Sequence, residues 1–252
     1  MPRRCDGGRV GEGRGRPGPG WRGTIGDVNA RYDDVLGPLR EAYDARAAWR
    51  DGLAKEPWKV AEREAFRNRL APGARVLELG AGTGQDSAYF RDEGLTAVAT
   101  DLSPAMVEHC RAKGIEAHVM DFLHLAFPAG SFDAAYALNC LLHVPNRDLP
   151  AVLAAIRTVL RPGGLLFVGV YGAAGESVEG PDAGDDYEPP RFFSWRTDEQ
   201  LLGFASASFA VVDFHVVDLG DGHRFQSLTL RVPSADREHR ARPSRDADTL
   251  GA

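Results

Sequence analysis

The chain has 252 residues, a mass of 27.3 kDa and a formal net charge of −6. Its length and 43% hydrophobic residues suit one α/β domain with extensions, and the acidic balance argues against nucleic acid as a partner. The three cysteines are too widely spaced for a disulfide framework or a zinc motif, which indicates a reducing cytoplasm, and no run approaches the ~20 apolar residues of a membrane span.

The first 27 residues are rich in Gly, Arg and Pro and predict a disordered extension, because they offer too few large apolar side chains to offset the entropy of ordering. A basic arm that binds RNA is the alternative. Ordered-looking sequence starts near Val28. A start of translation near Val28 is therefore a further hypothesis, which N-terminal sequencing of the native protein would test.

Apolar residues recur every three or four positions from 28 to 50 and from 56 to 70, which predicts two amphipathic helices before the first strand. Tyr32 and Tyr43 on the first of these helices are candidates for closing over a bound ligand and its acceptor. Core packing of the helix explains both tyrosines almost as well.

The stretch from 76 to 90 is an apolar run that breaks into glycine at alternate positions and then turns amphipathic, which predicts strand, turn and helix. Gly80, Gly82 and Gly84 can adopt positive φ and let backbone N–H groups approach a ligand. The helix that follows adds unpaired N–H groups and the positive end of its dipole. This arrangement predicts a site for a nucleoside-type cofactor.

Strands and helices then alternate along the chain, which favours an α/β fold with a doubly wound, mostly parallel sheet. Ser103 and Asn146 are expected to cap two of the helices, and Pro162-Gly163-Gly164 to end the second. The predicted strands cover residues 75–79, 96–100, 116–120, 132–138 and 165–171.

An acidic Gly/Pro-rich loop, 173–196, follows the core and is too long for a simple connector, so we expect it to bind the acceptor. Thr197 begins a capping box, and two further strands joined through Gly220 and Gly222 predict an antiparallel hairpin at one edge of the sheet. The predicted division is an extension 1–27, one domain 28–233 and a disordered tail 234–252. The domain comprises a helical lid 28–70, a core 74–172, the acceptor loop 173–196 and edge elements 197–233.

Two carboxylates stand at the predicted carboxyl ends of strands, the edge where open α/β sheets bind ligands. Asp101 ends the second strand about 20 positions after the glycine turn, the offset at which an acidic side chain accepts bonds from a ribose diol. Asp121 ends the third strand, where it can accept from an adenine amine while the Phe122 N–H reaches a ring nitrogen. Apolar faces against the adenine are available on Leu102 and Met106.

Taken together, residues 75–171 resemble the class I S-adenosylmethionine-dependent methyltransferases, and specifically their small-molecule branch. The matching pieces are VLELGAGTG, TDLSPAMV, MDF, FDAAYALNCLLHV and LRPGGLL. The resemblance implies a Rossmann-like methyltransferase fold. It also implies that S-adenosylmethionine is the cofactor and that its methyl group passes to a small molecule without a metal ion.

The resemblance also implies roles for individual residues in binding the cofactor. The backbone of the glycine turn, Ala81 included, would wrap the methionine part, with Glu78 below the turn. Asp101 would hold the ribose hydroxyls and Asp121 the adenine. Leu138 and Asn139 would approach the methionine amine or the sulfonium. For Glu78, a buried strand carboxylate bonded to the glycine loop is an equally open interpretation.

Other readings of these motifs fit less well. A dinucleotide dehydrogenase would need glycine where the chain has Gln85. Enzymes of this fold that methylate adenine or amide nitrogen usually carry Asn/Asp-Pro-Pro-aromatic after the fourth strand, but here Asn139 is followed by Cys140. Cytosine-C5 enzymes use a Pro-Cys nucleophile, so Cys140 is better explained as a small packed side chain. A non-catalytic S-adenosylmethionine-binding regulatory or accessory protein stays open.

Methyl transfer is an in-line displacement, so the protein mainly aligns the acceptor and excludes water. His143 is the best candidate for a general base, with orientation of its loop or contact with the cofactor as the alternative. Tyr171 is a second catalytic candidate, which could bond the acceptor or simply line the pocket. Acceptor recognition is expected in an aromatic patch that follows the acidic residues of the loop and includes Arg191, Phe192 and Trp195.

Overall fold

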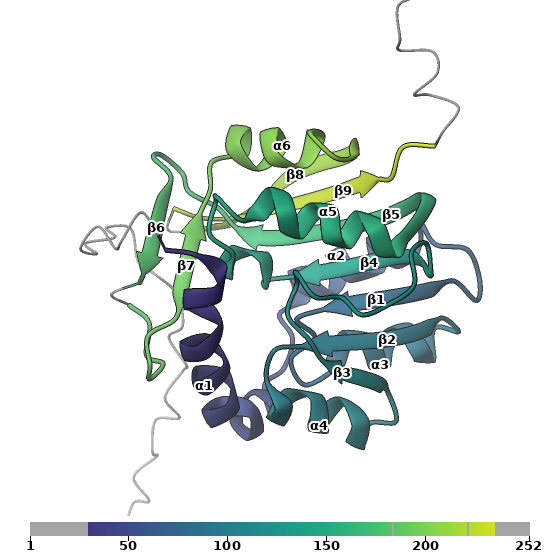
Figure 1. The fold of residues 1–252 in the computed structure, drawn as a ribbon, viewed down its shortest axis with the longest axis horizontal. Helices are drawn as coiled ribbons and strands as arrows, with labels where there is room; N and C mark the ends of the chain where they lie inside the picture. Colours follow the sequence, from purple (N-terminus) through teal and green to yellow (C-terminus); the bar gives the residue numbers. More distant parts are fainter. Residues whose placement is uncertain (1–29, 183, 221, 235–252) are drawn as a thin grey trace, which may run out of the picture.

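The computed structural model describes residues 30–182, 184–220 and 222–234; the predicted extension 1–27 and residues 235–252 of the predicted tail lie outside this part of the chain. Its centre is a seven-stranded sheet in the order β3-β2-β1-β4-β5-β9-β8 (Figure 1). The first five strands of this order are parallel, whereas β9 pairs antiparallel with both β5 and β8. The predicted fold class, with its antiparallel hairpin at one edge, is confirmed. The strands are β1 (Arg75–Leu79), β2 (Thr96–Asp101), β3 (Glu116–Val119), β4 (Phe132–Leu138), β5 (Leu160–Tyr171), β8 (Ala210–Gly220) and β9 (His223–Arg231).

Two apolar layers cover the faces of the sheet. Alternate residues of each strand point to opposite faces, so Leu77 belongs to the layer beneath α5 and α6, while Val76 belongs to the layer beneath α2 and α3. Helix α4 packs through Val107 on the neighbouring strands β2 and β3. The helices are α2 (Pro57–Arg67), α3 (Gln85–Asp92), α4 (Pro104–Ala112), α5 (Leu149–Val159) and α6 (Asp198–Ser206). None of the helices in the described part is long and apolar enough to cross a bilayer.

Helix α1 (Tyr32–Asp51) crosses the carboxyl ends of the strands, where the predicted site lies (Figure 1). Near its start the Tyr32 ring stacks on Phe122, just beyond β3. About two turns before its end, Asp44 accepts hydrogen bonds from the Ser103 hydroxyl and the Ala105 N–H at the start of α4. Of the predicted helical lid 28–70, α1 therefore lies over this edge of the sheet, whereas α2 packs on a face of the sheet through Phe66.

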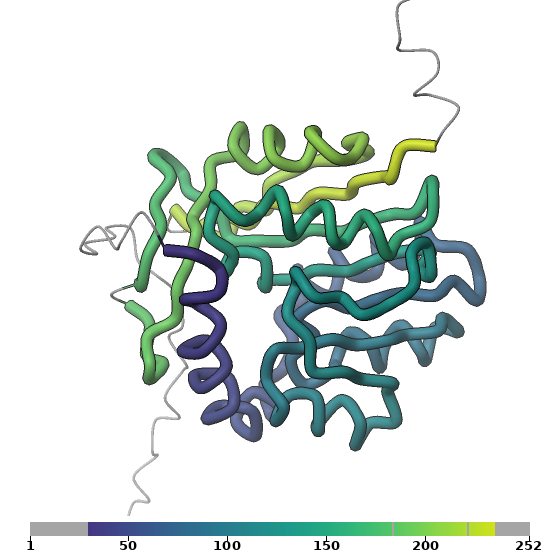
Figure 2. Tube along the Cα trace, in the orientation of Figure 1, coloured from purple at the N-terminus to yellow at the C-terminus, as the bar shows by residue number. Residues whose placement is uncertain are grey.

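The predicted acceptor loop contains a small sheet that the sequence did not predict. Strands β6 (Val178–Pro181) and β7 (Phe192–Trp195) pair antiparallel, and the segment runs beside α1, although the two are more than 100 residues apart in the chain (Figure 2). Arg46 of α1 donates to the carbonyl of Asp186 at 2.6 Å, and this contact joins the two segments.

The predicted helix that corresponds to α5 has wrong boundaries at both ends. Asp148, and not Asn146, occupies the N-cap of α5, because the Asn146 side chain accepts a hydrogen bond from Arg196 instead. At the other end α5 stops at Val159, and β5 begins at once with Leu160, which pairs with Phe132. The sequence Pro162-Gly163-Gly164 therefore lies in the irregular start of β5. By contrast, the caps predicted at Ser103 and Thr197 are both confirmed.

Candidate cofactor and acceptor site

The glycine turn after β1 has the backbone conformation that its sequence predicts. Gly80, Gly82 and Gly84 have φ of 60°, 56° and 79°, in the region that side chains disfavour. A Cβ added at Gly80 would lie 2.5 Å from the Cβ of Cys140, and one at Gly84 2.9 Å from the Cys110 sulfur. At Gly82 an added Cβ would meet no described atom within 4 Å. The outer glycines are thus required by packing, while the partly exposed Gly82 leaves the turn accessible to a ligand and the adjoining Ala81 is buried.

Two buried cysteines form the other wall of this turn. The Cys110 thiol donates to the carbonyl of Gly82 at 3.3 Å, and the Cys140 thiol to the carbonyl of Leu79 at 3.1 Å. Burial raises the pKa of Cys110 to about 12 and also raises that of Cys140. The prediction that Cys140 is a packed side chain is confirmed, because it is buried against Gly80.

Glu78, a residue of β1, lies beneath the turn and contacts the first turn of α3. Its carboxylate is buried and accepts a hydrogen bond from the Ser87 hydroxyl. Burial, reinforced by the nearby Asp86 carboxylate, raises the pKa of Glu78. Asp86 itself is held by Lys55 at 2.8 Å and Arg63 at 3.0 Å. Through Ser87, Glu78 thus links the strand before the glycine turn to the helix after it, whether or not it also contacts a ligand.

Asp101 lies where β2 ends, next to the glycine turn. One carboxylate oxygen accepts the Gly82 N–H at 2.8 Å and the other the Ser103 N–H at 2.9 Å. Burial raises the pKa of Asp101 to about 6, although these two hydrogen bonds oppose the shift. Since each carboxylate oxygen can accept more than one hydrogen bond, Asp101 retains the capacity to accept from a diol.

The end of β3 is arranged around Asp121 and Phe122. The Asp121 carboxylate accepts from the N–H groups of Leu123 and His124, at 2.8 and 3.1 Å, and contacts the His124 ring. The Phe122 N–H donates to the Tyr32 hydroxyl at 3.4 Å. Tyr32 thus lies at the predicted adenine end of the site, far along α1 from Tyr43. Of the predicted apolar partners, Met106 is buried and Leu102 is partly exposed.

Asn139, directly after Leu138 at the end of β4, has φ of 53°, the one non-glycine residue with positive φ in the described ranges. Its N–H donates to the Gly169 carbonyl at 2.7 Å, which holds the backbone in this conformation. Its side-chain oxygen is buried and has no hydrogen-bond partner among the described residues. A buried oxygen without a donor costs about 1–3 kcal/mol, so this atom fits a ligand that brings an N–H group.

His143 lies in the short 3₁₀ helix η1 (Leu141–His143), with both ring nitrogens engaged. Nδ1 lies 2.7 Å from the Phe192 carbonyl, so it must carry the proton and donate. Nε2 then accepts from the Tyr43 hydroxyl at 2.7 Å. Burial and the Arg191 charge lower the pKa of His143 to about 3, which keeps the ring neutral.

Arg191 extends this network. It donates to the Tyr43 hydroxyl at 3.1 Å and forms an ion pair with Asp185 at 2.6 Å. The structure therefore brings together three of the predicted residues, Tyr43, His143 and Arg191. It adds Asp185, Tyr187 and Arg50, which no motif or spacing in the chain singles out. The Arg50 guanidinium bonds the Tyr187 hydroxyl at 2.9 Å and stacks 5.2 Å above the Tyr43 ring.

Tyr171 and Trp195 lie in a second aromatic group. Tyr171 packs against Trp58 and Phe225, with ring centroids 6.3 and 5.8 Å away, and Trp195 stacks on Phe193. Phe193 in turn contacts the His143 ring at 4.9 Å. The rings of Tyr171 and Trp195 lie 6.4 Å apart, and both thus reach the His143 network through Phe193, which belongs to the predicted aromatic patch.

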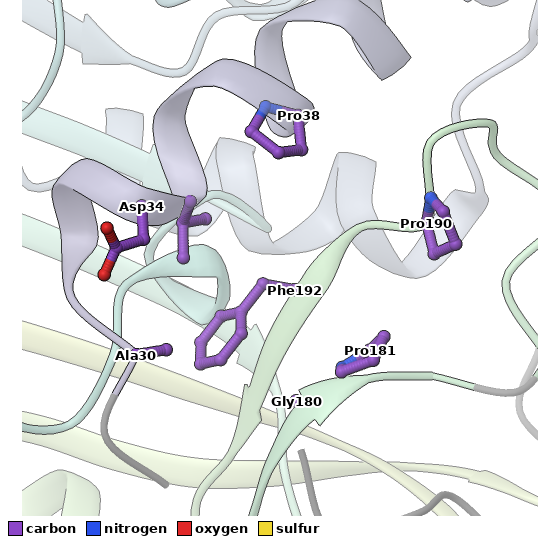
Figure 3. Close-up of a pocket in the computed structure, with 8 residues that line it drawn as sticks. Ala30, Asp34, Pro38, Gly180, Pro181, Pro190 and Phe192 are labelled. Atoms are coloured by element: carbon purple, nitrogen blue, oxygen red, sulfur yellow. The ribbon is translucent and has the colours of Figure 1, made fainter. Parts of the chain in front are cut away.

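Phe192 points to the other face of β7, because successive side chains of a strand alternate. It lines a pocket of about 240 Å³ between the start of α1 and the β6–β7 segment (Figure 3). The lining is mostly apolar, and its one charged residue, Asp34, accepts from the Arg31 N–H. No residue of the glycine turn lines this pocket, and Phe192, whose carbonyl accepts from His143 Nδ1, connects it to the His143 network. Its lining residues are Ala30, Asp34, Val35, Pro38, Gly180, Pro181, Pro190 and Phe192.

Comparison with known proteins identifies relatives of the region that carries the site. Residues 76–164 match the family model described as "Methyltransferase domain". The demethylmenaquinone methyltransferase of Beutenbergia cavernae is 38% identical over 149 residues, which cover 58% of this chain and 58% of that protein. Methyltransferase GfsG of Streptomyces halstedii is 32% identical over 127 residues, 47% of this chain and 45% of that protein. The chain thus spans about half the length of the curated relatives it matches.

Among solved structures, the fold is similar to that of the 1,6-didemethyltoxoflavin-N1-methyltransferase of Burkholderia thailandensis, with a TM-score of 0.67 and 24% identity. The similarity covers 81% of this chain and 92% of that one, which was solved with S-adenosylhomocysteine bound. The likeness therefore extends beyond the core to most of the described elements. In the described ranges, no group of three or more His, Cys, Asp or Glu side chains could hold a metal ion.

Proposed function

We propose that the protein belongs to the class I S-adenosylmethionine-dependent methyltransferases and transfers a methyl group from S-adenosylmethionine to a small molecule, since its residues 76–164 match a methyltransferase domain model. The observation that carries the proposal is the meeting, at one sheet edge beneath α1, of the glycine turn, the Asp101 carboxylate and the partnerless Asn139 oxygen. These groups match the hydrogen-bonding needs of an amino acid joined to a nucleoside.

The residues present fit the cofactor, and we assign them accordingly. The backbone from Gly80 to Gly84 and Asn139 would hold the methionine part, with Leu138 beside it and Glu78 supporting the turn. Asp101 would bind the ribose hydroxyls. Asp121, Phe122, Leu102 and Met106 would surround the adenine. When bound, S-adenosylmethionine supplies a methyl group on a positively charged sulfur.

The chain's own part in the reaction is alignment and exclusion of water. Helix α1 and the β6–β7 segment lie over the site and would shield it. Of the two roles predicted for His143, the engagement of both ring nitrogens supports orientation of its loop and of Tyr43 over action as a base. Tyr43 and Arg191 are the best-supported acceptor contacts. Phe192 joins the network through its carbonyl alone, while Tyr32, Trp195 and the catalytic candidate Tyr171 lie farther from it.

The proposal is tested by calorimetry with S-adenosylmethionine and S-adenosylhomocysteine, followed by assay of S-adenosylhomocysteine formation with a pool of small-molecule acceptors. Binding and turnover together support an enzyme. Binding without turnover on any pool supports the alternative of a regulatory or accessory protein. Absence of binding at millimolar concentration rejects both. We further propose that the protein acts in the cytoplasm, in keeping with two cysteines that are free thiols.

A further inference from the structure

The face of α1 that is directed toward η1 carries a positive charge that has no counter-ion within the described part of the chain. Tyr43 and Arg50 are seven residues apart and so share one face of the helix. Arg50 is partly buried, and its partners are the Tyr187 hydroxyl and the Tyr43 ring. Among the described residues no carboxylate lies within ion-pair distance of Arg50.

The neighbouring arginines differ in this respect. Asp185 neutralises Arg191 through contacts to both of its carboxylate oxygens. Arg46 lies 3.6 Å from Asp186, whose side chain is 65% exposed, so that pair lies at the surface. The cluster of Tyr43, Arg50, Asp185, Tyr187 and Arg191 therefore has a net charge of +1, located on Arg50.

Among the described residues of this cluster no group is free to take a proton. The nearby Asp101 carboxyl, whose pKa is raised by burial and lowered in part by the Arg50 charge, accepts the N–H groups of Gly82 and Ser103 with its two oxygens. The His143 lone pair accepts from Tyr43, and its low pKa, caused by burial and by Arg191, supports a neutral ring. The Asp185 carboxylate is occupied by Arg191. Glu179, on the neighbouring β6, accepts from the Asn146 N–H at 2.6 Å and the Ser194 hydroxyl at 2.7 Å. The remaining groups are the hydroxyls of Tyr43 and Tyr187, which are acids and not bases at neutral pH.

An acceptor that must lose a proton in the transition state would find no base here, whereas one that has already lost it would meet an unpaired guanidinium. We propose that this site takes its acceptor as a preformed anion, an acidic O–H or N–H compound that is ionised near neutral pH, with Arg50 as its counter-charge. A lone pair of the anionic atom forms the bond to the methyl carbon as the carbon–sulfur bond breaks. The electron pair of the broken carbon–sulfur bond stays on sulfur, which becomes a neutral thioether, and no proton moves.

This inference rests on the proposed function, so its test begins with the complex of the full chain and S-adenosylhomocysteine. The probe is 4-nitrophenol, whose ionised form is coloured. Titration of the probe with pH in the presence of excess complex gives its apparent pKa when bound. We expect the complex to bind the phenolate at least tenfold more tightly than the phenol, and Arg50→Gln to abolish this preference. Arg40→Gln, at an exposed position of the same helix, is the matched control and should retain it.

The outcomes separate the two proposals. If S-adenosylhomocysteine does not bind, the proposed function fails. If it binds but the complex takes neither form of the probe at millimolar concentration, or both equally, the inference about the acceptor is overturned and the function stands. If Arg50→Gln lowers the affinity for S-adenosylhomocysteine tenfold while the preference for phenolate persists, Arg50 binds the cofactor and the inference is likewise overturned.

Discussion

At the scale of single residues, Asp101 carries the sharpest expectations. Its two carboxylate oxygens accept only backbone N–H groups, at 2.8 and 2.9 Å, in a buried position. Asp101→Ala should weaken the binding of S-adenosylhomocysteine by about 1–3 kcal/mol, because one or two charge-assisted hydrogen bonds are lost. Calorimetry at pH 7.5 measures the change, and an unaltered affinity would remove Asp101 from the ribose site.

Asp101 should also shape the pH dependence of stability. Burial raises its pKa from 3.8 to about 6, so the native state binds this proton more tightly than the unfolded chain. The contribution of Asp101 to stability is therefore full below about pH 4 and declines as the pH rises to about 6. Urea unfolding of the ligand-free protein between pH 4 and 7 should show a shallower decline in Asp101→Asn. An identical slope in both proteins would contradict the raised pKa.

His143 and Tyr43 should behave as one unit, since the Tyr43 hydroxyl and His143 Nε2 are hydrogen-bonded to each other. We expect His143→Ala to lower turnover more than it lowers cofactor affinity, and Tyr43→Phe to do the same. The double variant should lose little beyond the more damaging single variant, because coupled residues are not additive. Additive losses in turnover would show that His143 acts independently of Tyr43.

Single residues were predictable where a motif fixes their distance from the glycine turn. The glycines and Asp101 follow such a pattern. Arg50, Tyr187 and Arg196 follow none: each is one of many similar side chains, with Lys and Arg alone numbering 30. Their importance comes from long-range packing of α1 and the acceptor loop, which no local spacing encodes.

At the scale of elements, Arg196 fixes η1 to the segment after β7. It is 1% exposed, and its guanidinium donates to the carbonyls of Leu141 and Val144 and to the Asn146 side chain. Arg196→Met would leave these acceptors unpaired, so we expect a loss of about 2–4 kcal/mol in the free energy of unfolding. Arg224→Met removes a partly exposed pair with Asp198 and should cost about 1 kcal/mol or less. Chemical denaturation compares them, and equal losses would contradict this role for Arg196.

Elements with strong local signals were predicted well. Strands β1, β2 and β4 and the caps of α4 and α6 match their sequence patterns. The start of α5 was missed because Asn146 and Asp148 are both good cap residues, and the choice depends on Arg196, 50 residues away. Strand β6 was missed because its segment is dominated by Gly, Pro and acidic residues, and β7 because its four residues were interpreted as an aromatic patch; it is their pairing that makes both of them strands.

At the scale of the whole molecule, binding should be visible as global stabilisation. S-adenosylhomocysteine at 100 times its Kd should add about 2.7 kcal/mol, which for a domain of this size raises Tm by roughly 5–10 °C. NAD at the same concentration should leave Tm unchanged, since the dinucleotide glycine pattern is absent at Gln85. Differential scanning fluorimetry measures both, and a shift with NAD alone would favour an oxidoreductase.

The contacts of α1 bear on how the protein is made in the cell. Tyr43 bonds His143, 100 residues later, and Arg191, 148 residues later. At a translation rate of about 5–20 residues per second, α1 would wait roughly 7–30 s after synthesis before Arg191 is added to the chain. Helix α1 is thus among the first elements synthesised and among the last to complete its tertiary contacts. A ribosome that pauses between these points would prolong the exposure of its apolar face to chaperones and proteases.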